Sequence, residues 1–371
     1  MKPTAAGSTT FKQTGLTLVE IMIALLLGLF LIAGVISIFV SNKQTYRLNE
    51  SLSRLQEDGR FVMEIFGSRL RSASYAGCYG DISAGVQNVL NNQANFAWNL
   101  TTPVQGFDNV AANVTIQGIA TRSSSGVATS LTSGVATTSI AGTDVLVLKG
   151  MSAGVPLETN PDNTTFTIAA ANNRFANGEI LLVTNCDQAS MFQASSVTTA
   201  GAVTTILHAS GGGLTPGNNS SSISETYGVD AEIGRLQTLM YNIRQGANGR
   251  AALFESRLVV TGGNTVALTA SELIPNVENM QLVFGVDTSG DQDADVYQDA
   301  SAVVNWQNVV SVRIALLLAS EEDNQVSVPE SYTFNAATFT YDKDNPIVAA
   351  RASRRFRRVF TGFVALRNRI L

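Results

Sequence analysis

The sequence has few of the residues on which catalysis usually depends. Among its 371 residues there is one histidine, His208, which lies between Thr and Ala residues of a predicted strand. Neither of the two cysteines, Cys78 and Cys186, has a basic neighbour in the sequence that would favour a thiolate. The G-x-S-x-G motif of serine hydrolases does not occur. The sequence therefore predicts a protein that is not an enzyme.

Charged residues are also scarce, at 14% of the chain, and Ser, Thr, Asn, Gly and Ala crowd its middle part. This composition is typical of exported, β-rich proteins rather than of cytosolic enzymes. The segment 351–371 carries seven Arg and no acidic residue, but it mixes them with apolar residues in a strand-like order. We interpret it as a solvated strand face, and we expect no nucleic acid partner.

The two cysteines allow one pair. In an oxidising compartment a Cys78–Cys186 disulfide would close a loop of roughly 110 residues and stabilise the fold by about 4–5 kcal/mol at most. Two buried free thiols, or one reactive thiol, are the alternatives that composition leaves open.

An uncharged apolar run begins at Ile21 and ends at Val40. At about 1.5 Å per residue, its twenty residues reach roughly 30 Å, the thickness of a bilayer core. The segment Met1–Gly15 carries Lys2 and Lys12 and no acidic residue, so the amino terminus is expected on the cytoplasmic side. No small-residue cleavage site follows Val40, and we therefore expect the run to remain as a membrane anchor.

One acidic residue, Glu20, stands at the start of this run. A lone carboxylate at a helix edge can lie at the lipid headgroups at little cost, whereas at mid-depth it needs a partner. Residues 15–20, GLTLVE, followed by the apolar run, resemble the class III leader of type IV pilins. The resemblance implies that prepilin peptidase cuts between Gly15 and Leu16 and methylates the new terminus, Leu16. It also implies that Glu20 pairs with the terminal amine of a neighbouring subunit during assembly.

Beyond Val40, apolar and small residues recur at spacings of three and four, which is typical of one buried face of a helix. The series consists of Leu48, Leu52, Leu55, Gly59, Val62, Phe66, Leu70 and Ala73. We predict one helix from about Thr17 to about Tyr75, ended by the Gly77 region.

Further segments resemble the PilW family of minor pilins. They are 41–48 (SNKQTYRL), 53–57 (SRLQE), 59–61 (GRF), 77–78 (GC), 183–190 (VTNCDQAS), 357–360 (RRVF) and 364–368 (VALRN). The resemblance implies an α+β, type IV pilin-like fold in which a long amino-terminal helix docks on a large antiparallel β-rich head. The expected parts are a cleaved leader (1–15), a transmembrane and stalk helix (16–76) and a periplasmic or extracellular head (77–371).

Short β-type runs set among turn-forming residues support a β-rich head. The predicted strands are Thr143–Lys149, Glu179–Asn185, Ala202–His208, Gln237–Arg244, Ala251–Val260, Met280–Val286, Val309–Leu318, Tyr332–Tyr341 and Arg357–Leu366.

An acidic stretch between two of these strands is the best candidate for a ligand site. Asp287, Asp291, Asp293 and Asp295 supply oxygen ligands of the kind that Ca²⁺ prefers, although the stretch lacks the glycine placement and closing Glu of an EF-hand. The alternative is an acidic hairpin turn without metal, and no other cofactor is expected.

The PilW resemblance implies a minor pilin that helps to prime type IV pilus assembly, with roles in twitching motility and adhesion. Its expected partners are prepilin peptidase, the inner-membrane assembly platform, the major pilin and other minor pilins. We expect it in the bacterial inner membrane before assembly, and in the pilus, near the tip, afterwards. The alternatives are a minor pseudopilin of a type II secretion system and a pilin whose head binds a ligand, as in adhesion or DNA uptake.

Overall fold

A computed structural model describes residue 15 and the ranges 17–80, 82–110, 121–122, 128–129, 139–140, 142–323, 325–326, 332–334, 339–341 and 354–369. The chain divides into two compact units, Met1–Ser53 and Arg54–Leu371, which are considered separately below.

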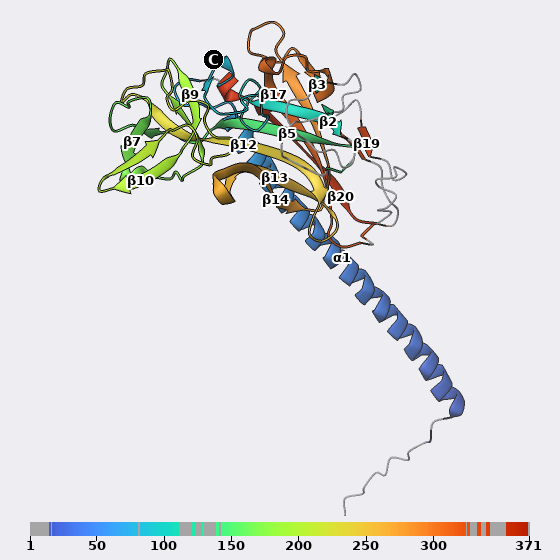
Figure 1. Ribbon diagram of the computed structural model, residues 1–371. Helices are drawn as coiled ribbons and strands as arrows, with labels where there is room; N and C mark the ends of the chain where they lie inside the picture. The colour runs from blue at the N-terminus through green and yellow to red at the C-terminus, as the bar shows by residue number, and fades with distance from the viewer. Residues whose placement is uncertain are drawn as a thin grey trace, which may run out of the picture. The chain divides into compact units, whose positions relative to one another are not determined.

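The helix α1 extends over Leu18–Ser72, close to the predicted range, and is the one described helix that is long and apolar enough to cross a membrane (Figure 1). In the amino-terminal unit its apolar side chains are exposed, including Leu25 at 69% and Phe30 at 70%. Such a continuous apolar surface requires lipid or other helices around it.

The described residues form three sheets and two short strand pairs (Figure 1). In the largest sheet, six strands follow one another in the order β1 (Gln87–Asn88), β9 (Ala189–Gln193), β8 (Ile180–Thr184), β12 (Glu232–Gln245), β13 (Ala251–Thr261), β14 (Thr265–Pro275). Two further strands, β5 (Thr143–Met151) and β6 (Val155–Pro156), also pair with β12, and β2 (Val104–Val110) pairs with β5. The second has the order β16 (Val296–Gln298), β15 (Val277–Val286), β17 (Val309–Ala319), β20 (Arg357–Ala365). The third has the order β10 (Ser196–Ala200), β11 (Val203–Leu207), β7 (Thr165–Ala169).

The strand pairs are β3 (Thr121–Arg122) with β4 (Ala128–Thr129) and β18 (Tyr332–Phe334) with β19 (Phe339–Tyr341). Short 3-10 helices are η1 (Ile82–Ala84), η2 (Ala170–Asn172), η3 (Gly262–Asn264), η4 (Ala300–Ala302), η5 (Trp306–Asn308) and η6 (Arg367–Arg369). All pairings are antiparallel except β1 with β9, so the predicted antiparallel, α+β architecture is confirmed. Every predicted strand overlaps an observed one, but the segment predicted as a single strand, Tyr332–Tyr341, supplies two paired strands.

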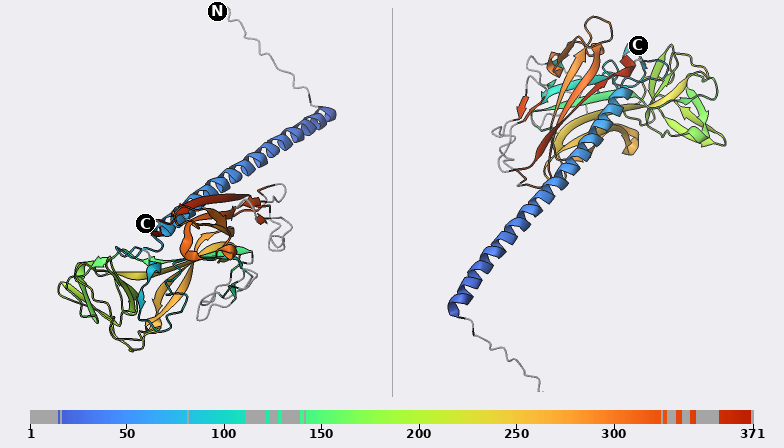
Figure 2. Two further views of the ribbon diagram at one scale, coloured as in Figure 1. Left: turned by 90° about the horizontal axis from the view of Figure 1, so that it is seen from above. Right: turned by 180° about the vertical axis from the view of Figure 1, so that it is seen from behind.

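The main hydrophobic core of the second unit forms between α1 and the sheets. The view from behind in Figure 2 shows the end of α1 lying along the strands. The predicted helical stripe supplies the helix side of this core: Leu55, Gly59, Val62, Phe66, Leu70 and Ala73 are all buried. The ring of Phe66 packs on Tyr241 of β12 with centroids 4.8 Å apart. This burial explains why the helix continues after its apolar run ends, since most helical stability in proteins comes from packing of one face.

Candidate functional site

The start of α1 forms a capping box. Thr17 Oγ1 accepts the backbone N–H of Glu20 at 3.3 Å, and Glu20 Oε2 accepts the backbone N–H of Thr17 at 3.4 Å. These reciprocal bonds satisfy N–H groups that a helix start otherwise leaves unpaired. The T-x-x-E spacing signals this arrangement, but it was not recognised in the sequence. Glu20 thus has a local structural role in addition to the predicted assembly contact.

Gly15 precedes this box, and a side chain at its position would meet no other atom. Packing therefore gives no reason for a glycine here. Leu16, the predicted new terminus, lies outside the described residues.

Two glycines bring α1 and β20 into close contact. A Cβ at Gly59 would collide with the ring of Phe360, and a Cβ at Gly362 would lie too close to Met63 Sδ. Because neither residue has a side chain, the strand can lie directly on the helix.

The end of α1 is held by two distant segments. The side chain of Asn368 donates Nδ2–H bonds to the carbonyl oxygens of Arg71 and Ala73, at 3.2 and 2.9 Å. Ser74, in the left-handed region with φ 65°, donates its N–H to the carbonyl of Lys149 in β5 at 2.8 Å. Carbonyl groups at a helix end need such partners, and the chain's last segment supplies part of them.

A buried ion group fixes the start of β20. Glu278 of β15 accepts bonds from Arg357 Nε at 2.7 Å and Nη2 at 3.3 Å, and Arg355 Nη1 lies 3.6 Å from the same carboxylate. All three residues are less than 10% exposed. The interpretation of the Arg-rich end as a solvated face is therefore wrong for Arg355 and Arg357. These buried arginines are tolerated because Glu278, 79 residues before Arg357, lies against both, and because Arg355 also donates to Asn276 Oδ1 and the carbonyl of Glu321.

Cys78 and Cys186 form the predicted disulfide, with Cα atoms 4.6 Å apart, so neither is a free thiol. The bond joins the segment after α1 to the turn between β8 and β9.

The acidic stretch closes the turn between β15 and β16. The Asp287 carboxylate accepts the backbone N–H groups of Gly290 at 2.6 Å and Gln292 at 2.8 Å, and the Asp295 carboxylate accepts that of Thr288 at 2.7 Å. These bonds hold the pKa values of both carboxyl groups below their usual range.

Asp291 and Asp293 lie on the exposed part of the same turn. Within the described ranges, no group of three or more His, Cys, Asp or Glu side chains is arranged to hold a metal ion. Calcium binding at Asp287, Asp291, Asp293 and Asp295 thus stays a prediction. Calorimetry with millimolar Ca²⁺ on the wild type and on Asp291→Ala tests it.

His208 is only 1% exposed and packs against Phe192, with ring centroids 5.1 Å apart and the ring planes tilted by 47°. Neither ring nitrogen makes a well-aligned hydrogen bond to the described residues, and burial lowers the pKa of His208 to about 4, which the nearby backbone of Asn163 and Ser220 only partly opposes. The histidine is therefore neutral at physiological pH and packs as a core residue.

This lowered pKa predicts a pH-dependent stability. Below about pH 6.5 the unfolded chain binds a proton at His208 that the folded chain does not bind until about pH 4. We expect stability to fall over that interval, by roughly 2–3 kcal/mol for this group. The measurement is the difference in free energy of unfolding between wild type and His208→Phe at pH 7 and at pH 4. A difference that does not change with pH would contradict the prediction.

An apolar amino-terminal helix followed by antiparallel sheets that pack on its second half is the α+β architecture of pilin-like proteins. Residues 240–368 match the family model PilW, described as Type IV Pilus-assembly protein W. The match confirms the resemblance to the PilW family over this segment, about a third of the chain, and supports a protein associated with type IV pilus assembly. No curated protein and no solved structure matches the chain.

The matched segment contains the elements that hold α1 from one side. Glu278, Arg357, Gly362 and Asn368 all lie within residues 240–368. The family similarity therefore covers the region that docks the helix.

Proposed function

We propose that the chain is a minor pilin, a low-copy subunit that helps to prime type IV pilus assembly from the bacterial inner membrane and lies near the filament tip. The observation that carries the proposal is the start of α1: Glu20 stands at the head of a helix whose apolar side chains are exposed along the whole run to Val40. Exposed apolar helices need lipid before assembly and other helices after it.

Processing follows from the same segment. The leader 1–15 is removed by prepilin peptidase after Gly15, and Leu16 becomes the methylated terminus. Packing against the described residues does not require a glycine at position 15, which agrees with a role in processing. The remaining parts are a transmembrane and stalk helix, 16–76, and a head, 77–371, for which we propose no catalytic activity.

The charge of Glu20 can be separated from its capping role. Gln serves in a capping box as Glu does, so Glu20→Gln keeps the cap but removes the charge. If Glu20 pairs with the amine of a neighbouring subunit, Glu20→Gln and Glu20→Ala should both be cleaved normally, yet both should enter pili about tenfold less, as expected for a lost contact of about 1.4 kcal/mol.

Quantitative immunoblots of sheared pili measure this incorporation, with Glu64→Gln, an exposed position on α1, as the matched control. Wild-type incorporation of Glu20→Gln together with failure of Glu20→Ala would leave Glu20 as a capping residue alone.

The choice between a pilus and a secretion system is tested by copurification from membranes. Recovery with other minor pilins supports the proposal. Recovery with type II secretion components alone would favour a minor pseudopilin.

A further inference from the structure

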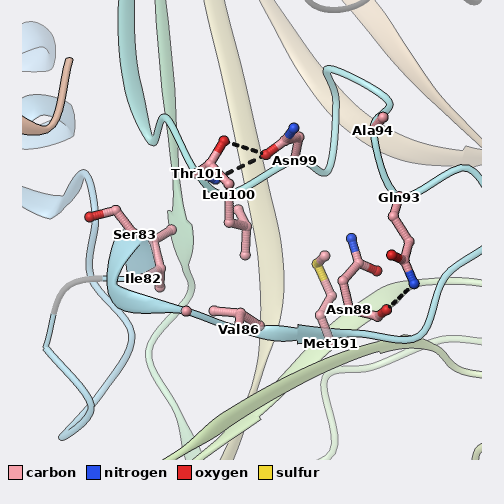
Figure 3. Close-up of a pocket in the computed structure, with 11 residues that line it drawn as sticks. Ile82, Ser83, Val86, Asn88, Gln93, Ala94, Asn99, Leu100, Thr101 and Met191 are labelled. Carbon is pink, nitrogen blue, oxygen red and sulfur yellow. Dashed lines mark hydrogen bonds between the residues drawn. The ribbon is translucent and has the colours of Figure 1, made fainter. Parts of the chain in front are cut away.

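A pocket of about 310 Å³ opens in the head between the segment 82–88 and the loop 93–101, and Met191 of β9 also lines it (Figure 3). None of the eleven residues that line it is ionisable. Its volume lies at the lower end of the range of small-molecule sites, roughly 300–1,000 Å³, and suits a ligand of one or two sugar rings.

Each of two amide side chains in the lining, Asn88 and Gln93, uses one of its two polar atoms in a hydrogen bond to the protein, while the other polar atom makes none to the described residues. Asn88 Oδ1 accepts the N–H of Leu90 at 3.0 Å, which directs its Nδ2 away from that bond. Gln93 Nε2 donates to the carbonyl of Asn88, as Figure 3 shows. Among the described residues, Asn88 Nδ2 and Gln93 Oε1 make no hydrogen bond. The lining therefore contains one amide donor and one amide acceptor that make no hydrogen bond to the described residues.

Apolar side chains also line the pocket, together with the polar residues Ser83, Asn99 and Thr101. Ile82, Leu100 and Met191 are each at most 5% exposed. In Figure 3 the ends of Leu100 and Met191 approach the pocket from two sides, and the Asn88 carboxamide projects beside Met191. A small methyl group would thus have an apolar surface next to the free amide groups.

The loop that carries the lining is held rigidly. Lys149 of β5 donates Nζ–H to the carbonyl of Asn99 at 2.7 Å, and Asn99 Oδ1 accepts the Thr101 hydroxyl at 2.7 Å. Thr238 of β12 donates to the carbonyl of Ala97 at 2.6 Å, and Trp98 Nε1 donates to the carbonyl of Asn92 at 3.0 Å. A pre-organised loop lowers the entropic cost of binding.

We propose that this pocket binds the acetamido group of an N-acetylhexosamine. The acetamido carbonyl accepts from Asn88 Nδ2, its N–H donates to Gln93 Oε1, and its methyl group contacts Leu100 and Met191. The neutral lining suits an uncharged sugar better than an anion or a cation. This inference is independent of the proposed assembly function, since the pocket uses none of the residues at the start of α1.

The test is a titration of the full chain in detergent with N,N′-diacetylchitobiose, and with cellobiose, which lacks the acetamido groups, as the control ligand. We expect saturable binding with a roughly millimolar dissociation constant for the first sugar and none for the second. Because the lining is uncharged, raising the salt concentration should leave the affinity unchanged.

A matched pair of variants locates the site. Asn88→Asp keeps the acceptor for Leu90 but removes the free donor, and should weaken binding about tenfold. Asn92→Asp makes the same chemical change at an exposed neighbour outside the lining and should have no effect. Equal binding by both variants and the wild type, equal binding of cellobiose, or no binding of diacetylchitobiose would overturn the proposal.

The acetamido sugar could come from peptidoglycan or from a surface glycan. Retention on isolated peptidoglycan, compared with retention on beads that carry a glycan ending in N-acetylglucosamine, distinguishes the two sources. Retention lost in Asn88→Asp on either material supports the site, whereas retention unchanged in that variant contradicts it.

Discussion

The double variant Cys78→Ser/Cys186→Ser is expected to lose up to about 4–5 kcal/mol of unfolding free energy at 25 °C, because the bond that it removes constrains the unfolded chain over 108 residues. The disulfide also has a defined place in the folded head. It attaches the segment that leaves α1 to the β8–β9 turn. Urea denaturation of the wild type and the variant measures the difference.

Reduction provides the control for this prediction. A reducing agent should lower the wild type to the stability of the variant and should leave the variant unchanged. A variant within about 1 kcal/mol of the oxidised wild type would show that the long loop contributes little, contrary to the chain-entropy argument.

Glu278→Ala should destabilise the head by about 3–5 kcal/mol, because the buried guanidinium groups of Arg355 and Arg357 would lose the carboxylate that compensates them. The loss of stability should extend to α1, because β20 starts at Arg357 and lies against α1 at Gly59. Chemical denaturation measures the loss of stability, and hydrogen exchange at the end of α1 measures the loosening of the helix.

Arg358→Ala is the matched control, because Arg358 is the exposed neighbour of Arg357 on the same strand. Its cost should stay within about 1 kcal/mol, as for most surface positions. If Glu278→Ala and Arg358→Ala lowered the free energy of unfolding equally, the buried ion group would not be what holds β20 in place.

Local pattern was enough to predict most of the architecture. The uncharged run and the three-four spacing of the stripe placed α1 to within three residues of its observed end at Ser72. β-rich runs placed all the long strands except β14, Thr265–Pro275. That strand contains Ala, Ser and Glu, lies at the edge of its sheet and buries only Val266 and Ile274. It is a strand because of its long antiparallel register with β13 rather than because of its own composition.

Features that depend on distant partners could not be predicted. The burial of Arg355 and Arg357 is set by Glu278, and the cap on α1 by Asn368, almost 300 residues away. The number of charged residues in the segment shows only that it is rich in Arg, and such a segment is predicted to be solvated. The pocket likewise has no motif, since it arises where a loop meets β9. By contrast, the capping role of Glu20 could have been predicted from the sequence, because its signal is local: Thr17 lies three residues before Glu20.

The central claim is that the chain enters the pilus as a processed subunit, and intact mass with amino-terminal sequencing of the chain in sheared pili tests it most directly. The account predicts a mature chain that begins at methylated Leu16, carries the Cys78–Cys186 disulfide and is far less abundant than the major pilin. A chain that retains Met1 and is found only in the membrane, never in sheared pili, would contradict it.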